Sequence, residues 1–241
     1  MFAHRELRVG VGVAITDRHG GVSRPPWASL NLADHVGDDP AAVTANRAQL
    51  TAALGSDVDA LVAMQQTHGA DVAVVDEPPE TPPVVDALVT RTPGVALLVL
   101  VADCTPILLS DRRAGVVAAV HAGRRGLAAG VLPAALSAMV ELGARPDRVY
   151  AVVGPGICPE HYEVPAQMRD EVAAAAPGAG VVTTAGRAAL DIRAGLLAQL
   201  HGAGVRRQVV LPHCTAKDDR FFSHRRDGVT GRFGGVVWMT P

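Results

Sequence analysis

The order of apolar and polar residues along the chain predicts alternating strands and helices. Residues 95–102, VALLVLVA, form a continuous apolar run, which predicts a strand buried on both faces. Shorter β-branched or apolar runs predict further strands at residues 7–15, 71–75, 107–110, 115–120, 149–153, 208–211 and 236–239.

Helices are expected between these strands. Residues 40–54 have the strongest signals, because Asp39 can cap the N-terminus, Pro40 suits the first turn and Gly55 can end the helix. Further helices are expected at residues 126–142, 165–176 and 188–200. The fold class is therefore mixed α/β (α+β), with buried mixed sheets flanked by helices.

Length and composition narrow the class of protein. The chain has 241 residues, of which 49% are hydrophobic, and this fits one domain spanning residues 1–241. A formal net charge of −2 gives no indication of nucleic-acid or membrane binding. The chain has 3 cysteines and no apolar leader segment, which favours a reducing, cytoplasmic location.

One expected hairpin brings two reactive side chains together. If residues 111–114 form its turn, Ser110 pairs with Gly115 and Cys104 lies directly opposite His121. Opposed side chains have Cβ atoms about 5 Å apart. At that separation the thiolate and the imidazole can share a metal ion or react with each other.

His68 completes a set of candidate metal ligands. Two histidines and one thiolate match a catalytic zinc site with three protein ligands and one open position for water. The alternatives remain open at this point. Cys104 can be the nucleophile of a metal-free cysteine hydrolase with His121 as base. Structural zinc usually has four protein ligands, and Cys158, Cys214 and His213 are the candidates for a fourth.

The segment after His121 can receive an anion. Residues 121–126, HAGRRG, join the end of a strand to the start of a helix, where free backbone N–H groups favour negative charge. Arg124 and Arg125 would add positive charge, and phosphate is a reasonable candidate for the bound anion. The alternative is an ordinary glycine-rich turn with solvated arginines.

Many short motifs in this order resemble one known family. The chain is similar to the laccase-domain family of purine nucleoside phosphorylases, the YfiH-like proteins once labelled polyphenol oxidases. The matching segments are residues 29–32 (SLNL), 35–40 (HVGDDP), 46–47 (NR), 66–69 (QTHG), 102–106 (ADCTP), 121–123 (HAG) with Gly126, 154–157 (GPGI), 162–164 (YEV), 214–215 (CT), 221–223 (FFS), 225–228 (RRDG) and 231–232 (GR).

The resemblance implies a site and an activity. It places the metal ligands on His68, Cys104 and His121. It implies phosphorolysis of adenosine, inosine and methylthioadenosine to free base and ribose 1-phosphate, with adenosine deamination as a side activity. It also implies a fold like that of cysteine hydrolases and toxin deamidases. Guanidinium groups bind phosphate bidentately, and the candidates are Arg47, Arg124, Arg125 and Arg232.

The resemblance leaves two further alternatives and three departures. A copper-dependent phenol oxidase is disfavoured, because the sequence has no His-x-His pair for further copper centres. A non-enzymatic cell-wall or division accessory protein would carry a structural metal. Arg124 stands where the family usually has tryptophan, His224 where it usually has tyrosine, and Gly195 near a frequent asparagine. Arg124 therefore bears on substrate preference.

Overall fold

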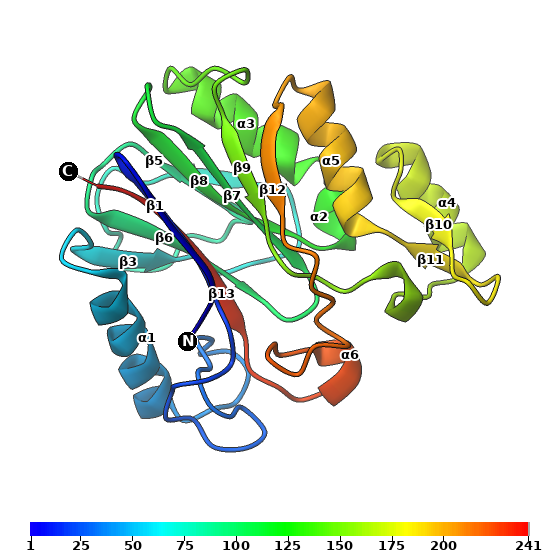
Figure 1. The fold of residues 1–241 in the computed structure, drawn as a ribbon, viewed down its shortest axis with the longest axis horizontal. Coiled ribbons are helices and arrows are strands. Elements are labelled where there is room, and N and C mark those ends of the chain that lie inside the picture. The colour runs from blue at the N-terminus through cyan, green and yellow to red at the C-terminus, as the bar shows by residue number, and fades with distance from the viewer. Residues whose placement is uncertain (241) are drawn as a thin grey trace.

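The computed structural model describes residues 1–240 and consists of two facing sheets with helices on their outer sides (Figure 1). The five-stranded sheet has the order β1-β2-β13-β6-β3, and the six-stranded sheet has the order β12-β9-β7-β8-β5-β4. The strands of the first are β1 (Phe2–Arg8), β2 (Val11–Thr16), β13 (Phe233–Met239), β6 (Val95–Val101) and β3 (Ala60–Ala63). Those of the second are β12 (Arg207–Val210), β9 (Tyr150–Val153), β7 (Thr105–Asp111), β8 (Val116–Ala122), β5 (Ala87–Thr90) and β4 (Val72–Val74).

Helices cover the outer face of each sheet. α1 (Pro40–Leu54) packs Leu50 and Leu54 against the five-stranded sheet. The outer face of the six-stranded sheet is covered by α2 (Arg124–Ala129), α3 (Val131–Glu141) and α5 (Ile192–Gly202). α4 (Ala166–Ala175), the hairpin of β10 (Gly180–Val182) and β11 (Ala188–Leu190), the 3-10 turn η1 (Pro159–His161) and α6 (His224–Asp227) complete the elements.

Three apolar cores hold these layers together. The middle core lies between the sheets and contains Val99 and Phe233 from one and Leu108 and Val152 from the other. Both β6 and β8 are buried along their whole length, which explains their continuous apolar sequences. The mixed α/β class with flanking helices is therefore confirmed.

Local signals predicted some elements well. α1 has the expected bounds, Asp39 accepts a hydrogen bond from the backbone of Ala41, and Gly55 follows the helix. β6 matches the apolar run. None of the helices formed by residues 1–240 combines the length and apolar character that crossing a membrane requires.

Three expected elements were wrong in part. The strand expected at 7–15 is interrupted by a turn at Gly10, which has φ +83° and separates β1 from β2. The helix expected at 126–142 is split by Gly130, whose left-handed φ of +82° closes α2 before α3 begins. The segment expected to be helical from 188 begins as β11, because residues 188–190 pair with β10 and Asp191 then caps α5.

The hairpin register also differs from expectation. Asp111 pairs with Val116, so the turn comprises residues 112–115 and Pro106, not Cys104, lies opposite His121. Asp111 explains the shift, because its carboxylate accepts backbone hydrogen bonds from Arg113 and Ala114 and so shapes the turn. The partner of His121 thus shifts by two residues, from Cys104 to Pro106, and a two-residue shift keeps each side chain on its expected face. Cys104 therefore lies diagonal to His121, just before β7.

Candidate metal centre

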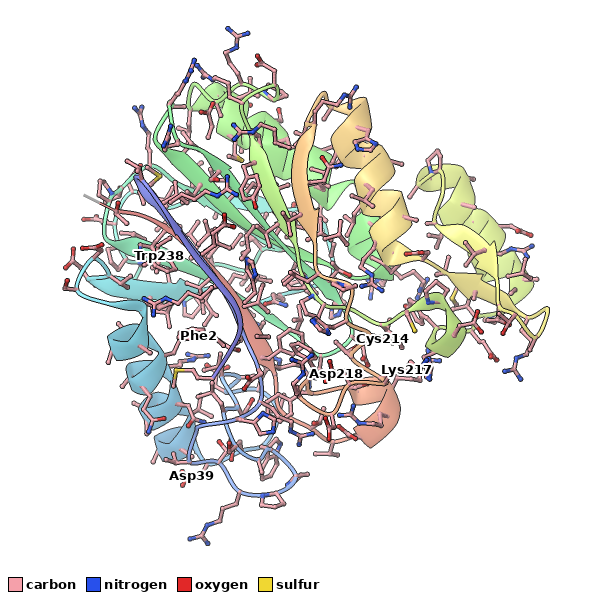
Figure 2. The ribbon with its side chains drawn as sticks, viewed as in Figure 1. Phe2, Asp39, Cys214, Lys217, Asp218 and Trp238 are labelled. Carbon is pink, nitrogen blue, oxygen red and sulfur yellow. The ribbon has the colours of Figure 1, made fainter. Side chains whose placement is uncertain are left out.

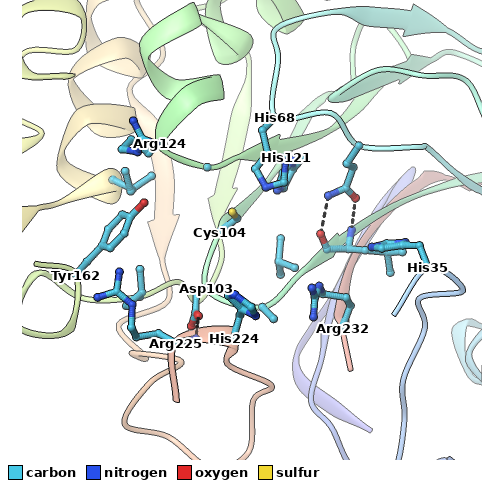
Figure 3. A pocket seen from close by; sticks show the side chains of 17 residues that line it. His35, His68, Asp103, Cys104, His121, Arg124, Tyr162, His224, Arg225 and Arg232 are labelled. Carbon is cyan, nitrogen blue, oxygen red and sulfur yellow. Dashed lines mark hydrogen bonds between the residues drawn. The ribbon is translucent and has the colours of Figure 1, made fainter. Parts of the chain in front are cut away.

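His68, Cys104 and His121 converge at one point (Figure 3). One ligand atom from each lies within 4.8 Å of the other two. His121 belongs to β8, Cys104 precedes β7, and His68 lies in the loop between β3 and β4. The structure thus brings together the three side chains that the sequence singled out.

The His68 loop is held by specific backbone contacts. His68 adopts a left-handed conformation with φ +63°, uncommon for a residue other than glycine. The Gln66 amide pairs with the backbone of Leu100, donating to its carbonyl and accepting from its N–H, each at 2.8 Å. These bonds tie the loop to β6 and place the His68 ring edge-on to His121, with ring centroids 4.7 Å apart.

Asp86 connects the His68 loop to His121 and was missed from the sequence. Its fully buried carboxylate accepts hydrogen bonds from Thr67 N and Oγ1, His68 N, Gly69 N and His121 Nδ1, at 2.6 to 3.1 Å. Burial raises the pKa of Asp86, but the hydrogen bonds from His121, Thr67 and Gly69 outweigh it and hold that pKa well below its usual range. The sequence feature that could have indicated Asp86 is a carboxylate directly before an apolar strand, β5.

The charge state of Asp86 fixes how His121 can act. An ionised carboxylate only accepts hydrogen bonds, so Nδ1 of His121 is the donor in their 2.8 Å contact. The other ring nitrogen, Nε2, is then available at the cluster. Metal-binding histidines usually have such a carboxylate partner on the second nitrogen.

Cys104 and His121 shift each other's pKa in opposite directions. Burial opposes the Cys104 thiolate, but His121 and His68 lower the pKa of this thiol to about 6. Burial opposes the His121 imidazolium, but the thiolate and Asp86 raise its pKa to about 9. A divalent cation can replace the proton between sulfur and nitrogen, so the donor set fits a metal.

Gly123 leaves room for this cluster. A Cβ at Gly123 would lie 2.8 Å from Cys104 Sγ and 3.1 Å from His68 Cδ2. Only a residue without a side chain therefore fits here without displacing two of the three donors.

The cluster opens into a pocket of about 410 Å³ (Figure 3). The wall combines the apolar residues Leu100, Ile157 and Ile192 with the arginines Arg124 and Arg232. The remaining lining residues are His35, Gln66, Val101, Ala102, Asp103, Gly123, Tyr162, His224 and Arg225, together with the three cluster residues. An apolar wall with a few cations suits a small planar ligand that is accompanied by an anion.

The structure separates the four arginines proposed from the sequence. Arg124 and Arg232 line the pocket. Arg47 does not, because it donates to the Leu32 carbonyl and lies 3.4 Å from the Asp34 carboxylate. Arg125 is exposed and lies outside the lining.

Arg225 lines the pocket and was not singled out from the sequence. Its guanidinium lies 5.3 Å from the centre of the Tyr162 ring. The RRDG motif at 225–228 was the signal for it.

The helix that begins at Arg124 has only 6 residues, so its dipole is small and the arginines must supply most of the positive potential.

Asp103 anchors the C-terminal part of the pocket. Its carboxylate accepts hydrogen bonds from Thr215 Oγ1, Ser223 Oγ and Arg225 N at 2.6, 2.7 and 2.7 Å. These three hydrogen bonds occupy the carboxylate of Asp103, the residue before Cys104. The role of Asp103 is to position residues 215–225. Figure 3 shows Asp103 below Cys104, between Arg225 and His224.

Within residues 1–240 no fourth His, Cys, Asp or Glu donor joins the first cluster. Cys158 and Cys214 belong to a separate group with His161. The His213 ring lies beside Asp218 and Arg220. The first cluster thus has three protein donors facing a pocket, the form of a site with one open position.

Comparison with known proteins identifies the family. Residues 12–240 match the family model described as multi-copper polyphenol oxidoreductase laccase. This chain belongs to that laccase-domain family. A purine nucleoside phosphorylase of Streptomyces coelicolor is 52% identical and aligns over 99% of this chain and all of its own. The purine nucleoside phosphorylase YfiH of Shigella flexneri is 38% identical over 97% of this chain and 96% of its own.

A solved structure agrees with this assignment. A Neisseria meningitidis protein superposes with a TM-score of 0.89 at 35% identity, covering 100% of this chain and 99% of that one. The resemblance to the laccase-domain family drawn from the sequence is therefore confirmed. The likeness to cysteine hydrolases stays a prediction.

Two of the three positions expected from the sequence to depart from the laccase-domain pattern lie in the pocket. Arg124 and His224 both line it, so they bear on what the pocket accepts. Gly195 lies elsewhere. A Cβ there would be 2.9 Å from Leu127 Cδ2 and 3.0 Å from Ala179 Cβ, so glycine permits α5 to pack closely against α2.

Proposed function

We propose that this protein is a zinc-dependent purine nucleoside phosphorylase acting on adenosine, inosine and methylthioadenosine in the cytoplasm. The observation that carries the proposal is a three-donor cluster, His68, Cys104 and His121, at the base of a pocket that also holds Arg124 and Arg232. The names of the relatives from Streptomyces coelicolor and Shigella flexneri support the same reaction.

Zinc suits the donor set. Two imidazoles and one thiolate with an open fourth position form a catalytic type of zinc site, and zinc bound there supplies Lewis-acid chemistry without redox change. The Asp86–His121 hydrogen bond and the space left by Gly123 support metal binding of this kind. Copper is the second choice for this donor set.

Arg232 and Arg124 are the proposed phosphate ligands. Neither takes part in the ion pairs found among residues 1–240, in contrast to Arg47 with Asp34 and Arg148 with Asp111. The guanidinium of Arg232 donates to the carbonyls of Thr230 and Gly231, and its partial burial lowers its pKa. A desolvated guanidinium without a carboxylate partner is suited to binding an anionic substrate.

The reaction makes one bond and breaks one. A phosphate oxygen bonds to ribose C1′, the C1′–N9 bond breaks, and the purine leaves with the electron pair and takes up a proton. The arginines would hold phosphate against C1′ and offset its charge, while Leu100, Ile157 and Ile192 exclude water from the base. Adenosine deamination is a proposed side activity of the same pocket, in which water adds to C6 of the base, the C6–N bond breaks and ammonia leaves to give inosine.

Phosphate-dependent release of base tests the main proposal. Purified protein is assayed with adenosine, inosine and methylthioadenosine, with and without phosphate, while inosine and ammonia report deamination and metal content is measured. We expect base release that requires phosphate and that disappears in Cys104→Ala, together with the zinc held by the cluster of His68, Cys104 and His121. Full phosphorolysis by a Cys104→Ala protein that has lost the zinc of this cluster would exclude the zinc mechanism, and oxidation of phenols would point to copper chemistry.

A second candidate function rests on one observation. Asp86, His121 and Cys104 follow one another as carboxylate, imidazole and thiol, the order found in cysteine hydrolases. In that case Cys104 attacks a carbonyl and His121 transfers the proton. Stoichiometric labelling of Cys104 by iodoacetamide, unaffected by added zinc, would favour it, whereas protection by zinc favours the phosphorylase.

A further inference from the structure

A second group of soft metal donors lies outside the pocket lining. The ligand atoms of Cys158, His161 and Cys214 lie within 4.8 Å of one another. Two of them come from the loop after β9, and the third comes from the segment after β12. Figure 2 labels Cys214 on this segment, near Lys217 and the start of α6.

The local backbone aims Cys158 and His161 in one direction. Cys158 is the N-terminal cap of η1 (Pro159–His161), and the N–H of His161 donates to its carbonyl at 3.0 Å. Side chains three residues apart on a 3-10 turn eclipse each other. The Cys158 sulfur and His161 Nδ1 are accordingly 3.4 Å apart.

This separation fits two ligands on one ion. With Zn–S about 2.3 Å and Zn–N about 2.1 Å, tetrahedral zinc holds a sulfur and a nitrogen about 3.6 Å apart. Glu160, between the two ligands in sequence, is engaged elsewhere, because its carboxylate accepts from the N–H and hydroxyl of Thr184. Among the described residues 1–240, no further His, Cys, Asp or Glu donor joins this group, so the fourth position is left to water.

Cys214 is brought to this group by backbone pairing. It forms a parallel bridge with Gly156, and the N–H of Thr215 donates to the Gly156 carbonyl at 3.2 Å. The backbone N–H of Cys158 points at the Cys214 sulfur at 3.1 Å. An N–H directed at sulfur stabilises a thiolate, and metal-bound sulfur commonly has such a donor.

We propose that Cys158, His161 and Cys214 bind a second zinc ion, which ties the loop 156–161 to the segment after β12. Two thiolates balance the charge of a divalent ion, and thiolate with imidazole is a donor set that zinc prefers. This site is separate from His68, Cys104 and His121 and stands whether or not that cluster is catalytic.

The second ion would stabilise one wall of the pocket. Ile157 and Tyr162 flank the ligands of the loop and line the pocket. The Arg225 guanidinium donates to the His161 carbonyl at 3.1 Å. Binding of zinc therefore fixes three residues of the wall without contacting the substrate.

Metal stoichiometry tests the proposal. Protein expressed with zinc and dialysed is measured for zinc per chain. We expect two ions in wild type, one in His161→Ala, one in Cys104→Ala and none in the double variant. His19→Ala, an exposed histidine, is the matched control and should retain two. Equal zinc content in wild type and His161→Ala would overturn the proposal, as would a protein two hydrogens lighter with a Cys158–Cys214 disulfide.

Cobalt loading gives a readout that counts thiolates. In the Cys104→Ala protein, cobalt should show a thiolate charge-transfer band with the intensity of two sulfur ligands, and this band should halve in Cys104→Ala/Cys158→Ser. Zinc added to Cys104→Ala should also slow hydrogen exchange in residues 156–162. A cobalt spectrum without sulfur ligands, or exchange unchanged by zinc, would contradict a site here.

Discussion

The carboxylate of Asp86 accepts a hydrogen bond from Nδ1 of His121 at 2.8 Å, and both side chains are buried. The same carboxylate holds the backbone of His68. One residue therefore orients two of the three proposed metal ligands. It does so from the start of β5, outside the cluster itself.

Asp86→Asn should weaken metal binding about 10- to 100-fold, since loss of a carboxylate partner commonly has this effect. Asparagine keeps one accepting oxygen, but its NH2 group replaces the other and cannot accept from the donors that face it. Zinc affinity is measured by competition with a chelator. Asp76→Asn, at an exposed carboxylate, is the control. An unchanged affinity in Asp86→Asn would show that Asp86 does not act through His121.

Gly123→Ala should reduce zinc affinity by at least about 10-fold, because functional zinc distances tolerate shifts of only about 0.2 Å. The new Cβ would lie 2.8 Å from Cys104 Sγ. The backbone φ of −90° at Gly123 accepts alanine, so the fold should persist. Gly202→Ala is the matched control, because its Cβ meets nothing within 4 Å. Full zinc binding by Gly123→Ala would place the ion elsewhere.

Arg232→Ala should raise KM for phosphate about 10- to 100-fold, the range expected for loss of hydrogen bonds to a charged group. Arg232→Lys should recover only part of this, because lysine lacks the planar fork. Initial rates at varied phosphate provide the measurement, and Arg113→Ala in the β7–β8 turn serves as control. A rise in KM for nucleoside alone would assign Arg232 to the base or ribose.

Asp111→Asn should destabilise the protein by about 2 kcal/mol at neutral pH, since buried hydrogen bonds to a charged group are lost. Burial opposes the charge on Asp111, but the backbone N–H of Arg145 and the guanidinium of Arg148 help to hold its pKa below its usual range. The pKa of Asp111 is lower in the folded state than in the unfolded state. The stability that its charge contributes is therefore fully present above the unfolded-state pKa and is lost as pH falls through the folded-state pKa.

Urea unfolding at several pH values measures this effect of Asp111. The difference between wild type and Asp111→Asn should be largest at neutral pH and shrink as the solution becomes acidic. A difference that is constant with pH would mean that the charge of Asp111 contributes nothing. Arg113→Ala again serves as control, because only the backbone of Arg113 contacts Asp111.

The sequence by itself determined the elements that depend on neighbouring residues. α1 followed from Asp39, Pro40 and Gly55, because capping and the first-turn preference act within a few residues. β6 followed from a continuous apolar run, because a strand buried on both faces has no polar face to show. The three cluster residues were found through chemical type and family motifs.

Tertiary structure decided what depends on distant partners. The strand at 188–190 forms because it can pair with β10, which local helix signals do not reveal. The register of β7 and β8 depended on a side chain, that of Asp111, shaping the turn. Asp86 became part of the site only because β5 pairs with β8 and brings its carboxylate to His121, which is 35 residues away in sequence.

The arginines show the same division. Sequence chemistry named four guanidinium groups for phosphate, but a guanidinium acts where its backbone places it. The fold directs Arg47 to the Leu32 carbonyl and leaves Arg125 exposed. It brings Arg225 to the pocket through the Asp103 carboxylate, 122 residues away in sequence. The sequence thus determined which chemical groups are available, and long-range pairing decided which of them meet.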